Sequence, residues 1–165
     1  MRVQRTLTGK KQTSSVLGFS KDTVAGDIND FLKTKDQTLC FAGDLEYSGI
    51  INLEWLCNIQ VVWGSAHFEA LKNTKFLHSL ETIYGDAFFN YVEDVSGLSS
   101  LVAIGGDAHF ENIISARGLE SLQYIGGDLH LANLASVEAL GGIQYVGGTV
   151  FYKGQPIEAE EFLKR

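Results

Sequence analysis

The 165-residue sequence has little cysteine, a single proline and no apolar run long enough to cross a bilayer. Its two cysteines, Cys40 and Cys57, are too few for a disulfide framework or a cysteine-based metal site, so we expect reduced thiols. Residues 1–15 are basic but lack the apolar segment of a signal peptide. These absences predict a cytoplasmic protein without membrane association, and the scarcity of proline favours a regular structure.

Positive charge is also scarce beyond the N-terminal segment. Residues 1–35 carry seven Lys or Arg against three Asp or Glu, whereas residues 36–165 carry six against seventeen. An acidic body disfavours nucleic acid as a ligand, because phosphate recognition needs a basic surface. We therefore expect no direct nucleic-acid binding and consider a partner protein with a basic surface instead.

Glycine recurs every 21 residues, without insertion or deletion, over most of the chain. The repeated glycines are Gly43, Gly64, Gly85, Gly106, Gly127 and Gly148. A strict period of this length predicts a solenoid, in which each repeat forms one rung and buries its apolar side chains only by stacking on its neighbours. We expect this glycine to be required by a positive φ or by the close approach of a neighbouring rung.

Within each rung, positions are numbered from the residue after the repeated glycine. Positions 2 and 4 are apolar or aromatic and position 3 is mixed, which predicts a short parallel strand with positions 2 and 4 inward and position 3 outward. Apolar residues also recur at positions 7, 13, 16 and 19, and the three-residue steps predict a helical or 3₁₀ turn leading into a second extended segment. Position 4 forms a mainly aromatic inner spine of Tyr47, Phe68, Phe89, Phe110, Leu131 and Tyr152.

The segment from Gly118 to Asn133 reads Gly-Leu-Glu-Ser-Leu-Gln-Tyr-Ile-Gly-Gly-Asp-Leu-His-Leu-Ala-Asn. This string resembles one rung of receptor L domains and their leucine-rich repeat relatives, and the rung ending at Asn112 resembles it too. The resemblance covers about residues 38–152, with shorter rungs and an incomplete asparagine ladder. It implies a right-handed, β-rich solenoid with parallel short strands and a ligand-binding flank, and it names no ligand.

We divide the chain into three segments. Residues 1–37 hold a basic stretch and an amphipathic helix predicted over 22–34, residues 38–152 form a six-rung solenoid, and residues 153–165 form a second helix that starts at Pro156. Both helices are expected to cap the solenoid, because its open ends would otherwise expose core and strand edges.

The outward position-3 row and its position-5 neighbours form the predicted partner-binding surface. These residues are Glu46, His67, Phe88, His109, His130 and Phe151, with Glu69 and Glu111. A rigid, pre-ordered surface loses little entropy on binding, so we expect a non-catalytic scaffold that binds another protein. Replacing Phe88 and His109 with Ala should then weaken binding and leave stability nearly unchanged.

Two further surface patterns have alternative interpretations. His109 and His130, flanked by Asp107, Asp128 and Glu111, would suit a zinc site, but we favour a solvent-facing ladder because no close His or Cys pairing accompanies them. We therefore expect no metal and no cofactor.

The aspartates that follow the repeated glycine suit either an acidic stripe or acceptance of backbone N–H bonds, and we favour the second. They are Asp44, Asp86, Asp107 and Asp128.

Aromatic residues are also paired at outer positions of adjacent rungs. Tyr124 and Tyr145 share position 18, and Trp63 and Tyr84 share position 20. Such clusters suit a protein interface and equally suit burial against the caps.

Neither a nucleophile with its base nor a phosphate loop is recognisable in the sequence, so we do not expect an enzyme. The alternative function is an acidic inhibitor that imitates nucleic acid, of the phage anti-defence or anti-CRISPR type. The acidic body motivates it and the basic N-terminal segment weakens it. A metal-dependent hydrolase that uses His109, His130 and Asp128 is the third hypothesis.

Overall fold

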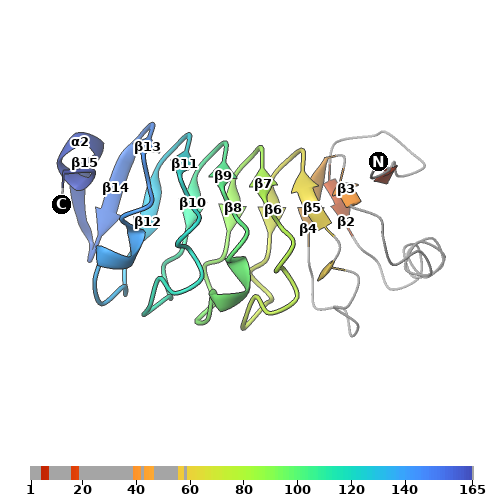
Figure 1. Ribbon diagram of the computed structural model, residues 1–165, viewed down its shortest axis with the longest axis horizontal. Helices are drawn as coiled ribbons and strands as arrows, with labels where there is room; N and C mark the ends of the chain where they lie inside the picture. Colours follow the sequence, from red (N-terminus) through yellow and green to blue (C-terminus); the bar gives the residue numbers. More distant parts are fainter. Residues whose placement is uncertain are drawn as a thin grey trace.

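The computed structural model describes residues 5–7, 16–18, 39–41, 43–46, 56–57 and 59–164, and every structural statement below concerns these residues. The helix predicted over 22–34 and the spine residue Tyr47 lie outside them. The described chain winds into a β-solenoid in which two parallel sheets run side by side along the long axis (Figure 1). The predicted repeat solenoid with short parallel strands is thus confirmed, as far as the described residues reach.

The two sheets take alternate strands of the chain. Sheet A runs in the order β1 (Arg5–Leu7), β3 (Leu39–Phe41), β5 (Ile59–Val62), β7 (Thr82–Ile83), β9 (Ala103–Ile104), β11 (Tyr124–Ile125) and β13 (Tyr145–Val146). Sheet B runs in the order β2 (Val16–Gly18), β4 (Asp44–Glu46), β6 (Ala66–His67), β8 (Ala87–Phe88), β10 (Ala108–His109), β12 (Leu129–Leu131), β14 (Thr149–Tyr152) and β15 (Gln155–Glu158).

The 21-residue period sets the strand register. His109 of β10 pairs with Phe88 of β8 and with His130 of β12, each 21 residues away. In sheet A, Tyr124 of β11 pairs in the same way with Ala103 and Tyr145. Because the step is 21 residues from β5 to β13 in sheet A and from β4 to β14 in sheet B, residues at one position of the repeat lie above one another there.

The core consists of the predicted ladders. In the five rungs before Gly148, positions 2, 7, 13, 16 and 19 are buried wherever their burial is described, and so is position 4. In the sixth rung Val150 is buried and Tyr152 packs half-buried at the end. Phe89 stands at the centre of the position-4 spine, with its ring centroid 5.2 Å from those of both Phe68 and Phe110. The predicted turn is a 3₁₀ helix at η2 (Ser96–Leu98) and η3 (Glu138–Leu140), and Leu56 and Cys57 of the first rung also have 3₁₀ conformation.

The C-terminal end differs from the prediction. Pro156 does not start a helix but lies in β15, which pairs antiparallel with β14, and only α2 (Ala159–Phe162) is helical. The cause is the two-residue turn at Lys153 and Gly154, whose positive φ values of 51° and 76° fold the chain back as a hairpin. Proline is tolerated in β15 because this strand lies at the edge of the sheet. The helix predicted as a cap is therefore replaced by a hairpin strand and one helical turn (Figure 1). Phe162 of this turn is buried.

The N-terminal segment also contributes to the sheets. Strands β1 and β2 both fall within residues 1–37, where the sequence predicts only a basic stretch and a helix, and they pair with β3 and β4. None of the helices that the structure describes is long and apolar enough to cross a membrane.

Candidate functional site

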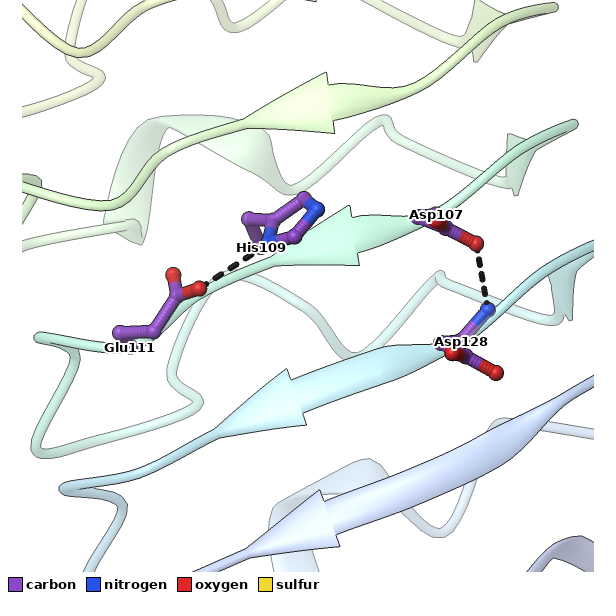
Figure 2. A network of polar contacts seen from close by, with 4 residues as sticks. All are labelled: Asp107, His109, Glu111 and Asp128. Carbon is purple, nitrogen blue, oxygen red and sulfur yellow. Dashed lines mark hydrogen bonds and ion pairs between the residues drawn. The ribbon is translucent and has the colours of Figure 1, made fainter. Parts of the chain in front are cut away.

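A ladder of side chains holds the corner at which the chain passes from sheet A to sheet B. The Asp107 carboxylate accepts a hydrogen bond from the Asp128 backbone N–H at 2.8 Å (Figure 2). The Asp107 N–H donates to Asp86 at 2.8 Å. Asp128 accepts the Thr149 N–H in the same way at 2.7 Å. Asp44 and Ser65 continue this ladder in the earlier rungs. The aspartates thus have the structural role favoured from the sequence.

The repeated glycine is required by close approach to this ladder. A Cβ atom on Gly127 would lie 2.0 Å from Oδ1 of Asp107. A Cβ on the preceding Gly126 would lie 2.0 Å from the backbone oxygen of Gly105. Of the two reasons expected from the sequence, steric closeness applies from Gly64 to Gly148, whereas the first repeated glycine, Gly43, has a positive φ of 103°.

On sheet B, the outward position-3 side chains form one continuous stack, which we call the position-3 row. Its rings lie nearly parallel, and successive centroids from His67 through Phe88, His109 and His130 to Phe151 are 4.6, 4.8, 4.5 and 4.7 Å apart. All five side chains are half-buried, and those from His67 to His130 lie between buried neighbours, which confirms the predicted alternation in these rungs. The rings cover each other's faces, so mainly their edges meet solvent. The side chain of Glu46, predicted to begin this row, lies outside the described residues.

Carboxylates at position 5 contact two of these histidines. Nδ1 of His109 lies 2.9 Å from Oε1 of Glu111, and Nδ1 of His67 lies 3.5 Å from Oε1 of Glu69. The other Glu111 oxygen, Oε2, is buried and has no hydrogen-bond partner among the described residues. Ligand atoms of His109, Glu111 and His130 all lie within 4.8 Å of one another.

The sequence hypothesis of a metal-dependent hydrolase placed Asp128 beside the two histidines. Figure 2 shows Asp128 instead at the far end of the strand, at the corner, where its carboxylate binds the Thr149 N–H. The histidines are joined by Glu111, which follows His109 by two residues and so projects from the same face of the extended chain. Glu111 is among the three carboxylates that the sequence places beside the histidines, and the i, i+2 spacing is the signal that distinguishes it from Asp107 and Asp128.

Sheet A presents a different outer surface, which we call the aromatic face. Trp63 stacks on Tyr84 with centroids 4.5 Å apart, and Tyr124 stacks on Tyr145 at 4.9 Å. These four side chains are 44–53% exposed. Eight large hydrophobic side chains are exposed in the part that the structure describes, and five of them lie on or beside this sheet: Trp63, Tyr84, Val102, Tyr124 and Tyr145.

The aromatic face is also nearly free of charge. At positions 17, 18 and 20 of the five rungs between Gln60 and Gly147, Glu81 is the single charged residue, and the Gln60 amide donates a hydrogen bond to it. The two aromatic pairs are visible in the sequence, although the contact surface is predicted there on the position-3 row. The signal that distinguishes the pairs is the lack of charge around them in an otherwise acidic chain.

Two titratable groups lie away from both faces. The Ser96 backbone N–H, which donates to Asp94 at 2.9 Å, lowers the pKa of that carboxyl group. Burial raises the pKa of the Cys40 thiol, which makes it less reactive as a nucleophile.

Comparison with protein-family models, with curated proteins and with solved structures gives no match for this chain. The candidate surfaces are therefore defined by geometry and chemistry alone.

Proposed function

We propose that the protein is a non-catalytic scaffold that binds another protein through the aromatic face of sheet A. The observation that carries this proposal is the concentration of exposed Trp, Tyr and Val side chains on one nearly uncharged sheet. Contiguous exposed apolar patches mark interaction sites in soluble proteins. Trp and Tyr dominate the binding energy of protein interfaces, whose centres are depleted of charge.

The stacking pattern leaves aromatic surface open to a partner. In sheet A each stack contains two rings, because position 20 is Gly105 in the rung after Tyr84 and position 18 is Ala103 in the rung before Tyr124. The ring faces at these ends are therefore not covered by another ring. Backbone hydrogen bonds between neighbouring strands and a close-packed core hold the rungs that carry these rings. The rings are therefore ordered before binding, and little conformational entropy is lost when a partner binds.

The chemistry of the aromatic face defines the kind of partner. Glu81 is its one charge, and the glutamines at position 17 supply neutral hydrogen-bonding groups beside the rings. A matching partner surface is apolar with neutral polar groups at its rim, rather than the basic surface expected from net charge.

The position-3 row remains the proposed second contact surface. The exposed ring edges of His67, Phe88, His109, His130 and Phe151, with the carboxylates of Glu69 and Glu111, suit a basic partner. We rank it below the aromatic face because its rings are half-buried and cover one another.

We also propose that the solenoid has the right-handed form of leucine-rich repeat and receptor L domains. The support is the resemblance of residues 118–133 to the rung of that family. The two parallel sheets agree with a solenoid in general and favour no handedness.

Competition in an extract of the source cells tests the leading proposal. Immobilised protein should retain a partner that free wild-type protein displaces. Free Trp63→Ser/Tyr84→Ser/Tyr124→Ser protein should displace it poorly. The matched control, Tyr91→Ser/Ile114→Ser, replaces exposed hydrophobic side chains outside both surfaces and should displace it as well as wild type does. Equal displacement by the sheet A variant, with circular dichroism showing that all variants are folded, would refute the aromatic face as the binding surface.

A further inference from the structure

We propose that His109, Glu111 and His130 form a surface site for a divalent transition-metal ion of the zinc type. The three side chains come from two adjacent rungs of sheet B and offer two imidazole nitrogens and one carboxylate. All their ligand atoms lie within 4.8 Å of one another. The site is independent of the leading protein-binding proposal, which concerns the aromatic face of sheet A, and it lies within the position-3 row and its carboxylates.

His109 and Glu111 already have nearly the spacing of a chelating pair. Nδ1 of His109 lies 2.9 Å from Oε1 of Glu111 (Figure 2). Two ligands about 2.0–2.2 Å from a tetrahedral zinc ion stand roughly 3.4 Å apart. A small opening of this hydrogen-bonded pair therefore admits an ion. The rigid strand holds both side chains on one face, since residues i and i+2 project in the same direction.

His130 supplies the third ligand from the next rung. Its backbone is in register with that of His109, and the two rings are stacked with centroids 4.5 Å apart and planes 7° from parallel. To point a nitrogen at an ion held by His109 and Glu111, the His130 ring must turn out of this stack. Position 5 of its own rung is the small, exposed Ala132, which leaves room beside the ring for that rotation.

The second Glu111 oxygen provides an independent indication of a missing partner. Oε2 is buried and accepts no hydrogen bond from the described residues. Most buried polar atoms in proteins are paired, because an unpaired one costs free energy. A cation bound at this carboxylate would offset that cost. Two imidazoles and one carboxylate suit Zn²⁺ better than Mg²⁺ or Ca²⁺, which prefer oxygen ligands, and leave a fourth position for water.

The same row contains an internal comparison. His67 and Glu69 repeat the His-x-Glu pattern, with Nδ1 and Oε1 3.5 Å apart. Their neighbour in the next rung is Phe88, so this pair has no second imidazole. It should bind zinc much more weakly than the site at His109.

Isothermal titration calorimetry of the full chain with zinc chloride tests the proposal. Wild type should bind one ion at the principal site. His130→Phe and Glu111→Gln should each weaken binding at least about tenfold, because even the loss of an outer-shell partner has an effect of that size. His67→Phe should bind like wild type. Phenylalanine already occupies this row at Phe88 and Phe151, so both histidine variants keep the stack and should remain folded.

Three results would overturn the proposal. One is the absence of a binding heat for wild type, with native mass spectrometry showing no zinc adduct. Another is equal zinc affinity for wild type, His130→Phe and Glu111→Gln, with melting temperatures showing that the variants are folded. An equal loss in His67→Phe and His130→Phe would count against it as well, because it would place the ion elsewhere.

Discussion

The two sheets of this solenoid share one repeat but present different chemistry to solvent. On sheet B, outward rings stack continuously over five rungs, and carboxylates contact two of the three histidines. On sheet A, the rings form two separate pairs, with glycine or alanine at the same positions in between. The backbone ladder fixes the ring spacing in both sheets, so it does not explain the difference. What differs is whether a ring has ring neighbours on both sides, and this decides how much aromatic surface remains available.

The buried core provides the reference for the changes in stability that are expected on the two outer faces. Phe89 is fully buried between Phe68 and Phe110, so Phe89→Ala should lower the free energy of unfolding by about 3–5 kcal/mol. Urea denaturation followed by circular dichroism measures this loss. A loss no larger than that for Tyr124→Ala, on the aromatic face, would mean that the inside and outside of the rung are assigned wrongly.

The corner between the sheets should be the next most sensitive region. Gly127→Ala should cost roughly 1–3 kcal/mol, because its Cβ would collide with the Asp107 carboxylate. Gly141→Ala is the matched control, since its φ is −61° and the nearest atom to its Cβ would be 3.4 Å away. It should be neutral or stabilise by up to about 1 kcal/mol. The melting temperatures of Gly127→Ala and Gly141→Ala are measured and compared. A loss in Gly127→Ala alone supports the steric explanation, whereas equal losses would indicate that alanine is poorly tolerated at turns in general.

The stability that the aspartate ladder contributes should depend on its hydrogen-bond acceptor atoms more than on their negative charge. Asp107→Ala leaves the Asp128 N–H without its acceptor and should cost about 1–3 kcal/mol. Asp107→Asn keeps an acceptor oxygen and should lose much less stability. Equal losses in the two variants, measured by urea denaturation, would show that the negative charge itself is required.

The smallest effects are expected on the two outer faces, and they should differ. His109 is 20% exposed at its side chain and stacks on both neighbours, so His109→Ala should cost about 0.5–1.5 kcal/mol and His109→Phe little. This revises the expectation from the sequence that alanine at this position leaves stability unchanged. Tyr124→Ser should stay within about 0.5 kcal/mol, because this exposed ring has a stacking partner on one side only. Comparable losses at both positions would remove the distinction between the faces.

The periodicity of the sequence predicts the parts of the fold that repeat. A side chain at Ile83 recurs as Ile104 and Ile125, and in-register stacking places these one above the other in the core. The 21-residue period could not predict the segments that do not repeat. The hairpin at Lys153 and Gly154 depends on two local φ values, and β1 and β2 pair with the solenoid without following its spacing.

The candidate sites were predicted less well than the fold, for a physical reason. Alternation along a strand identifies which side chains face outward, but exposure also depends on the neighbours above and below. The position-3 row is outward yet largely covered by its own stack, whereas Tyr84 and Tyr124 adjoin small residues and stay open. Similarly, Glu111 rather than Asp128 joins the histidines, because the corner ladder already uses Asp128.

Site-specific photo-cross-linking from the two faces tests most directly which one binds the partner. A photoreactive phenylalanine analogue is placed at Tyr124 on sheet A in one protein and at Phe151 on sheet B in another, and each is irradiated in an extract of the source cells. The account predicts one dominant protein adduct from position 124, lost when Trp63→Ser and Tyr84→Ser are added, and little adduct from position 151. A dominant adduct from position 151, with none from position 124, would contradict it.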